Sequence, residues 1–289
     1  MKRLGILTTC ALLAACGGSG TRSNAAAGKT FSYSAPVTAT AAETAALDAQ
    51  VASAATLNGS LDASTAPNAV GMADFSGATD ALLPQGATLR VALPKSVSAP
   101  LPRLALSVAA TSGFDLPQCV SVNATGTSGT ITFSNCAVTS TTTDTYTNVT
   151  TTTKVTLSGT VHSAAPGSLD WDLTAGVSMT DSQGVALSGS AHQHGDLTVT
   201  STTIKGSMLA ETALTMTAPG GSISAAVDES LTVDVTYTAG PPECVTGGTL
   251  EAKRVWVQRP QGATAAQLPD QAAKITWTGC GTGEIAFSQ

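Results

Sequence analysis

The stretch Leu169-Asp-Trp-Asp-Leu-Thr-Ala-Gly-Val-Ser-Met179 alternates apolar residues with polar or small ones along its whole length. A period of two is the signature of a β-strand that buries one face, because successive side chains of a strand point to opposite sides. The odd-numbered residues, including Trp171, are therefore predicted to face a core. The even-numbered ones, including Asp170 and Asp172, are predicted to face water.

The same alternation extends on both sides, over residues 154–237. Tight turns are predicted at 165–167, 182–184, 193–195, 205–206 and 219–220, mostly on their glycines. These turns place Met179 opposite Leu187, Ala191 opposite Leu197, Leu197 opposite Leu214, and Met216 opposite Ile223. Every apolar row then stays on one side, so the predicted fold class is mainly all-β: a large antiparallel meander sheet, curved or half-barrel-like.

A short N-terminal helix is predicted as the cover for the apolar face. Thr40-Ala-Ala-Glu43 is a capping box, and an alanine-rich stretch with Leu47 follows as far as Asn58-Gly59. We expect a helix over residues 41–57 and two further strands over 87–93 and 103–109. Residues 60–85 carry no clear pattern.

The composition narrows the class of protein. Charged residues make up only 11% of the chain and aromatic residues 4%, and the formal net charge is −6. An acidic, weakly charged surface argues against a nucleic-acid partner, which requires basic patches. The small aromatic content predicts a thin core built from aliphatic residues, as in a broad sheet.

The first sixteen residues form an export signal. Lys2 and Arg3 precede an apolar stretch over 4–15, which is too short for a permanent membrane helix. The stretch ends in Leu13-Ala14-Ala15-Cys16, which resembles the lipobox of bacterial lipoproteins. The resemblance implies cleavage before Cys16 and acylation of its thiol, and two or three acyl chains suffice for stable attachment. The alternative is an ordinary secretory signal in which Cys16 is incidental.

Cleavage there would leave 274 of the 289 residues and a net charge of −8, because both basic residues leave with the signal. In enteric-type lipoproteins an Asp after the Cys favours the inner membrane, so Gly17 and Gly18 imply the outer membrane; its periplasmic and surface sides remain open. The predicted organisation is a signal peptide (1–15), a lipidated Cys with a flexible tether (16–30), an N-terminal helix plus strands (31–116), and the meander with two disulfide-stapled segments (117–289).

Four cysteines remain for disulfides in an oxidising compartment. Two segments open with Cys-Val and close with related hexapeptides, Ile131-Thr-Phe-Ser-Asn-Cys136 and Ile275-Thr-Trp-Thr-Gly-Cys280. This repeat predicts the disulfides Cys119–Cys136 and Cys244–Cys280. A two-residue turn at 127–128 would also place Cys119 opposite Cys136 and Val122 opposite Phe133. A cysteine metal site is the rival interpretation, but the chain has no Cys-x-x-Cys pair.

No catalytic residues are predicted. Gly-x-Ser-x-Gly, His-Glu-x-x-His and glycine-rich phosphate loops are all missing from the sequence. His192 and His194, with Asp196 nearby, have a usual metal-ligand spacing, although a turn at 193–195 would separate them. Asp170 and Asp172 could act as an acid/base pair only inside a cleft, and on a flat sheet they are predicted to be solvated. No cofactor is expected.

The sequence therefore predicts a lipid-anchored envelope protein, most simply a non-enzymatic structural or partner-binding module. The first alternative is a carrier of a lipid or another apolar ligand, whose curved sheet would resemble the half-barrel of the LolA and LolB lipoprotein carriers. Its pocket would be lined by Trp171, Met179, Met208, Leu214 and Met216. A second alternative is divalent-metal binding through His192 and His194.

Overall fold

The structure is a computed structural model. It describes residues 23–45, 47–48, 119–125, 128–144, 146, 148–165, 167–238 and 244–289. Several predicted elements lie outside this part of the chain. They are the signal peptide with Cys16, the expected strands at 87–93 and 103–109, and the part of the predicted helix that follows residue 48.

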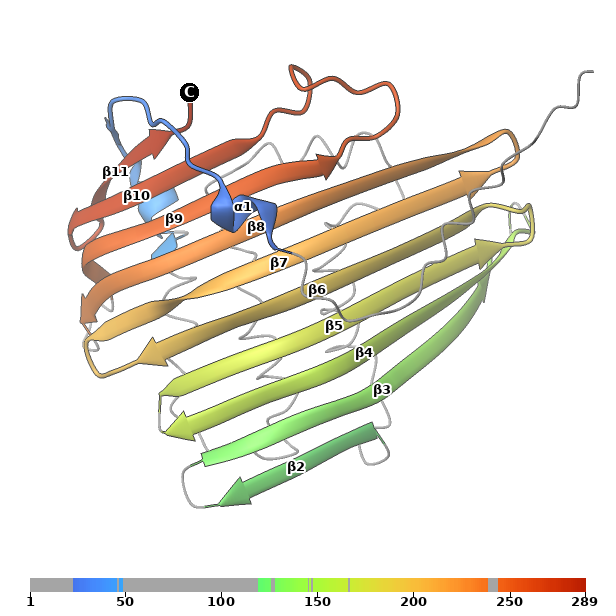
Figure 1. Cartoon of the computed structure of the whole chain (residues 1–289), viewed down its shortest axis with the longest axis horizontal. Coiled ribbons are helices and arrows are strands. Elements are labelled where there is room, and N and C mark those ends of the chain that lie inside the picture. The colour runs from blue at the N-terminus through green and yellow to red at the C-terminus, as the bar shows by residue number, and fades with distance from the viewer. Residues whose placement is uncertain are drawn as a thin grey trace, which may run out of the picture.

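The described residues form eleven strands in one open antiparallel sheet, coloured along the chain in Figure 1. Their order in the sheet is β1-β11-β10-β9-β8-β7-β6-β5-β4-β3-β2, so that from β2 to β11 each strand pairs with the next one in the chain. The predicted fold class, a large antiparallel meander, is therefore confirmed. The strands are β1 (Val37–Thr38), β2 (Val120–Thr125), β3 (Ser128–Thr143), β4 (Thr150–Ala165), β5 (Ser168–Asp181), β6 (Ala186–Val199), β7 (Thr203–Ala218), β8 (Gly221–Thr238), β9 (Cys244–Gln258), β10 (Gln271–Gly279) and β11 (Thr282–Phe287).

Three of the five predicted turns are confirmed, and two are wrong. The pairs Met179–Leu187 and Met216–Ile223 lie opposite each other as expected. In contrast, β6 and β7 run unbroken through 193–195 and 205–206, so Leu197 faces Leu169 and Gly206 rather than Ala191 or Leu214. The turn between these strands lies at 200–202, where the Thr200 hydroxyl accepts a hydrogen bond from the Thr203 N–H (2.9 Å).

The glycines that suggested the two wrong turns have another role. A Cβ atom at Gly195 would lie 2.7 Å from Cζ2 of Trp171, and one at Gly206 would lie 2.1 Å from the carbonyl oxygen of Asp196. These positions lack a side chain because neighbouring groups approach the backbone closely.

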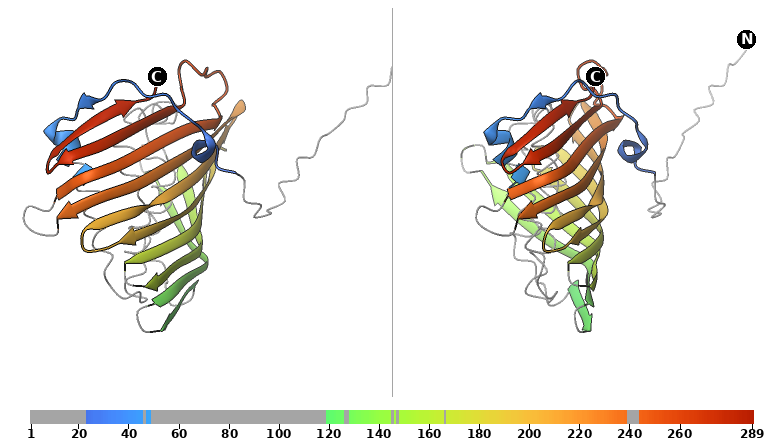
Figure 2. Two further views of the ribbon diagram at one scale, coloured as in Figure 1. Left: turned by 60° about the vertical axis from the view of Figure 1, so that its left-hand side comes forward. Right: turned by 90° about the vertical axis from the view of Figure 1, so that its left-hand side faces the viewer.

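The two faces of the sheet differ in chemistry, as the alternation predicted. Figure 2 shows the sheet twisted and curved, with the helical residues 41–45 and 47–48 (below, the 41–48 helix) on the concave side and the short helix α1 (Ala25–Gly28) on the convex side. Leu47 packs with the concave apolar residues in one cluster that includes Trp171 and Met208. The convex face carries Ser, Thr, Asp and His side chains.

The predicted capping box at the start of the 41–48 helix is confirmed. The Thr40 N–H donates to Oε2 of Glu43 (2.8 Å), and the Glu43 N–H donates to Oγ1 of Thr40 (3.3 Å). Hydrogen bonds from the hydroxyl and the N–H of Thr40 hold the pKa of the Glu43 carboxyl below its usual value.

Residues 23–30, assigned above to a flexible tether, are instead docked on the sheet. Ala26 of α1 is fully buried, and Lys29 forms an ion pair with Asp270. Burial raises the pKa of Asp270, but hydrogen bonds from Lys29 and the Trp256 N–H, together with the charges of Lys29 and Arg259, outweigh it and hold the pKa below its usual value. Residues 23–30 therefore differ from the predicted flexible tether, because composition carries no information about this long-range anchorage; residues 16–22 lie outside the described part of the chain.

Both predicted disulfides are present, Cys119–Cys136 and Cys244–Cys280. The register of the first hairpin differs from the prediction, since Phe133 faces Val120 rather than Val122. A bulge between Phe133 and Cys136, with Asn135 at a φ of 53°, restores the approach of the two cysteines. The shift is two residues, so the predicted apolar face of the hairpin is retained.

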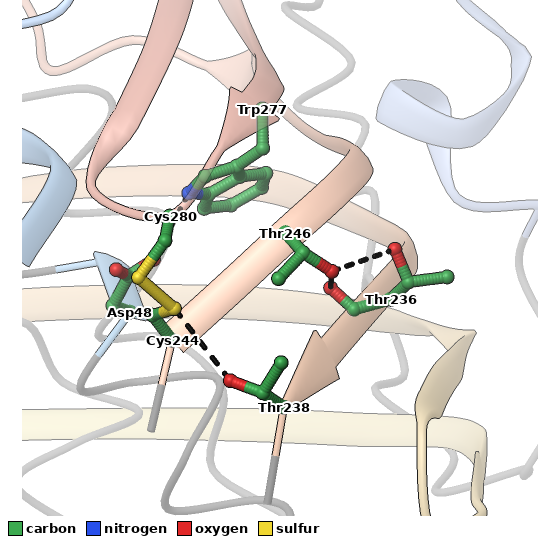
Figure 3. The surroundings of a disulfide bond; sticks show 7 residues. All are labelled: Asp48, Thr236, Thr238, Cys244, Thr246, Trp277 and Cys280. Atoms are coloured by element: carbon green, nitrogen blue, oxygen red, sulfur yellow. Dashed lines mark hydrogen bonds between the residues drawn. A yellow bond between two sulfur atoms is a disulfide. The ribbon is translucent and has the colours of Figure 1, made fainter. Parts of the chain in front are cut away.

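The second disulfide lies at one end of the sheet, beside the 41–48 helix (Figure 3). The indole Nε1–H of buried Trp277 donates to Oδ1 of Asp48 (2.9 Å). Burial raises the pKa of Asp48, and the hydrogen bonds from Trp277 and from the Val245 backbone only partly offset it. A polar contact therefore joins the helix to the stapled strands.

Candidate functional site: a convex groove beside the N-terminal helix

An open groove of about 410 Å³ lies on the convex face, between α1 and the middle of the sheet. Three strands contribute side chains to it, because even-numbered residues of β5 and β6 and odd-numbered residues of β7 share this face. The groove is lined by Ser23, Asn24, Ala27, Gly28, Asp172, His192, His194 and Leu209.

The α1 wall of the groove is fixed by hydrogen bonds. The Asn24 side-chain oxygen accepts from the N–H groups of Ala26 and Ala27 (both 3.1 Å), which makes Asn24 the N-cap. Its amide nitrogen donates to the carbonyl oxygens of Ala210 and Glu229 in the sheet. Asn24 is itself buried, so a single side chain both starts the helix and holds it on β7 and β8.

A buried carboxylate reinforces this docking. The Ala25 N–H donates to Oδ2 of Asp228 (2.8 Å), and Asp228 is fully buried under α1. The neighbouring Glu229 points to the other face of the sheet, as the alternation of β8 requires. There it pairs with Arg254, whose Nε donates to Oε1 of Glu229 (2.6 Å). No sequence pattern indicated this Glu229–Arg254 ion pair, because its two residues are 25 positions apart.

The two histidines of the groove lie side by side. Their ring centroids are 5.2 Å apart, and Nε2 of His192 is 2.9 Å from Oδ1 of Asp172. Nδ1 of His194 is buried without a hydrogen-bond partner. The predicted turn at 193–195 would have separated the rings, and the unbroken course of β6 is what places both on one face.

The third metal candidate does not join them. The carboxylate of Asp196 accepts a hydrogen bond from the Ser207 hydroxyl (2.8 Å). Within the described ranges, no three His, Cys, Asp or Glu side chains converge in a way that could hold a metal ion. The groove instead offers imidazole and carboxylate groups for hydrogen bonding, beside the apolar side chain of Leu209.

The two aspartates of β5 flank a buried tryptophan, as predicted. Trp171 is 4% exposed on the concave side, while Asp170 and Asp172 are exposed on the convex side. Asp172 is 65% exposed despite its contact with His192. Such an open position does not give the desolvation that an acid/base pair requires.

The residues proposed to line an apolar pocket do share the concave face, but they pack tightly. Trp171, Met208 and Leu214 are 4%, 2% and 6% exposed. Met179 and Met216 are partly buried against a cluster around Leu214. Gln193 lies among these residues and donates to Sδ of Met208, a contact that the wrong turn at 193–195 concealed.

Comparison of the chain with protein-family models, with curated proteins and with solved structures finds no match. None of the helices in the described part is long and apolar enough to cross a membrane.

Proposed function

We propose that this protein is a lipid-anchored, non-enzymatic module of the bacterial cell envelope, attached to the outer membrane through acyl chains on Cys16. In this proposal its broad, disulfide-stapled sheet serves as a rigid support, and the groove beside α1 binds an envelope partner. Protein–protein interfaces combine a buried core with a polar, solvent-accessible rim, and the groove has half-buried His192, His194 and Leu209 beside exposed Asp172.

The docking of α1 is the observation that carries the proposal. Only six residues separate Cys16 from Ser23, which lines the groove, and the seven Cα–Cα steps between them span at most about 25 Å. An acyl anchor at Cys16 would therefore keep the groove close to the membrane surface. A flexible tether through residue 30 would allow about twice that distance.

The alternative function, an apolar-ligand carrier, has weaker support. It requires space between the concave residues, and Trp171, Met208 and Leu214 are all less than 7% exposed. Ile223 at the rim of this face is 43% exposed, and it is the position from which a bound lipid would be detected.

The anchor is tested by Cys16→Ser. We expect this variant to leave the membrane fraction, and the wild-type N-terminal peptide to carry an acyl mass. Cys10→Ser is the matched control, because Cys10 lies within the signal peptide and its loss should leave fractionation unchanged. A wild-type peptide without acyl mass, or a Cys16→Ser variant that stays in the membrane, would overturn the lipoprotein proposal.

The partner site is tested with a photo-crosslinking amino acid placed in living cells at Leu209, in the groove, or at Ile223, on the concave rim. The module proposal predicts a protein adduct from Leu209 and none from Ile223. A lipid adduct from Ile223, with no protein adduct from Leu209, would favour the carrier instead.

A further inference from the structure

The floor of the convex groove has a one-sided charge. Helix α1 contacts β8 and β9, so β5, β6 and β7 form the floor beside it (Figure 1). Lys205 of β7 is paired with Asp234 of β8, with Nζ 3.1 Å from Oδ1. Among the residues of the three floor strands, the convex face therefore presents carboxylates and no second basic side chain. Its charged residues are Asp170, Asp172, Asp196, Lys205 and Glu211.

Three of these carboxylates are exposed and lie close together. Asp170 and Asp196 are directly opposite each other on β5 and β6, a position in which Cβ atoms are about 5 Å apart. Asp172 follows Asp170 on the same face, about 7 Å further along the strand. Like charges placed in this way repel each other, so a bound cation would relieve a repulsion that is present in the free protein.

A row of three side chains crosses the groove floor at right angles to the strands. His194 lies opposite Asp172 of β5 and opposite Leu209 of β7. Since neighbouring strands are about 4.8 Å apart, the two ends of this row are about 10 Å apart. The row runs from an exposed carboxylate, over an imidazole ring, to a half-buried apolar side chain.

A lysine or arginine side chain matches this row along its length. Its methylene stem packs along apolar surface while its charged end reaches a polar partner. On the groove floor the stem would lie over Leu209 and the His194 ring, and the charged end would reach Asp172. Oδ1 of Asp172 contacts Nε2 of His192, which leaves Oδ2 of the same carboxylate as an acceptor for a further N–H group.

We propose that the groove is the docking site for a polypeptide segment that carries a basic side chain next to an apolar one. This docking chemistry deepens the proposed function and rests on its partner site. Charge complementarity selects the partner and speeds its encounter with the groove. Nucleic acids and anionic lipid head groups would be repelled by the same carboxylates.

The first test measures binding of a defined probe to the purified full-length protein. The probe is a short rhodamine-labelled peptide of leucines and lysines, and the matched probe carries acetylated lysines, which removes the charges but keeps the stems. We expect acetylation to weaken binding several-fold, as measured by fluorescence anisotropy. Equal binding of the two peptides would overturn the proposal.

The second test separates the groove from the negative charge of the whole protein. Asp172→Asn and Glu284→Gln each remove one negative charge, but exposed Glu284 lies on β11, which β8, β9 and β10 separate from β7. Asp172→Asn should weaken binding of the lysine peptide several-fold, and Glu284→Gln should leave it unchanged. Leu209→Ser keeps every charge and should also weaken binding. Equal effects of the two charge variants, or no effect of Leu209→Ser, would overturn the proposal.

Two other occupants of the groove are outcomes of the same assay. Lysine amide that competes as well as the peptide would mean that the groove binds free amines and not a polypeptide. Arg22 adjoins Ser23 in the sequence. Peptide binding that requires Arg22→Ala would mean that the chain's own arginine fills the groove. Either result would overturn the proposal.

The two proposals fail differently. If photo-crosslinking at Leu209 gives a protein adduct but the lysine peptide shows no dependence on charge or on Asp172, the partner site stands and its basic chemistry is wrong. If the peptide binds as expected but Cys16 carries no acyl chain, the anchor is wrong and the docking chemistry stands.

Discussion

At the scale of single residues, the position of a side chain on one face or the other decides its environment. Leu214 is 6% exposed on the concave face and lies between Gly189 and Ala225. The adjacent Thr215 lies on the convex face and hydrogen-bonds to the Ser224 hydroxyl (3.0 Å).

Leu214→Asp should therefore bury a carboxylate without a partner and lower the free energy of unfolding by about 3 kcal/mol or more. Thr215→Asp adds the same charge one residue away and should cost less than about 1 kcal/mol. Urea unfolding of both variants measures the difference. Equal losses would mean that the convex face is as closed to water as the concave one.

Asp48 gives a pH-dependent prediction. Its folded-state pKa is raised by burial, so its ionised form opposes folding above that pKa, and this cost disappears as the pH falls below the usual value near 4. Asp48→Asn keeps an oxygen acceptor for the Trp277 indole and should raise the urea midpoint slightly at pH 7 but not at pH 3.5. A lower midpoint at pH 7 would show that the charge strengthens the indole contact more than burial penalises it.

At the scale of elements, α1 shows how a four-residue helix can be held in place. Isolated helices of this length are unstable, so its order depends on contacts with the sheet. Asn24 supplies the cap and two hydrogen bonds to strand carbonyl oxygens, and Asp228 accepts from the first turn.

Asn24→Ala should cost about 1–2 kcal/mol and release residues 23–30 from the sheet. Hydrogen–deuterium exchange should show faster exchange in that segment and unchanged protection in β5 and β6. Ser23→Ala is a suitable control, because Ser23 is exposed and does not cap the helix. Unchanged exchange in Asn24→Ala would mean that burial of Ala26 alone holds α1.

Each disulfide joins strands that are also paired in the sheet. Cys119–Cys136 fastens the short edge hairpin β2–β3, and Cys244–Cys280 joins the start of β9 to the turn between β10 and β11. Both disulfides lie at an end of a hairpin-like segment, where the paired strands would begin to separate. The two related hexapeptides of the sequence, which end in Cys136 and Cys280, correspond to this shared position.

At the scale of the whole molecule, α1 sets the orientation relative to the proposed membrane anchor. Because α1 lies on the convex face, a fluorophore at Thr232 on that face should be quenched by acceptor-labelled lipids more strongly than one at Ile223 on the concave rim. The comparison is made with acylated protein in vesicles, and Cys16→Ser should abolish both signals. Stronger quenching at Ile223 would mean that the concave face is turned to the membrane.

The sequence by itself determined the meander, its apolar face, the capping box and both disulfide pairs. Each of these depends on local periodicity or on a short repeat, which a single chain displays directly. Gly195 and Gly206 misled the turn prediction, because a glycine that makes room for Trp171 or for a neighbouring strand looks the same in sequence as one that forms a turn.

Only the tertiary structure decided which residues form the groove. The groove joins Asn24 and Ser23 to His192 and His194 across more than 160 residues. Contacts of this kind arise when the chain buries polar groups such as Asp228, which must find hydrogen-bond partners wherever the fold brings them. The partners of a buried polar group come from distant parts of the chain, so no periodic pattern in the sequence predicts them.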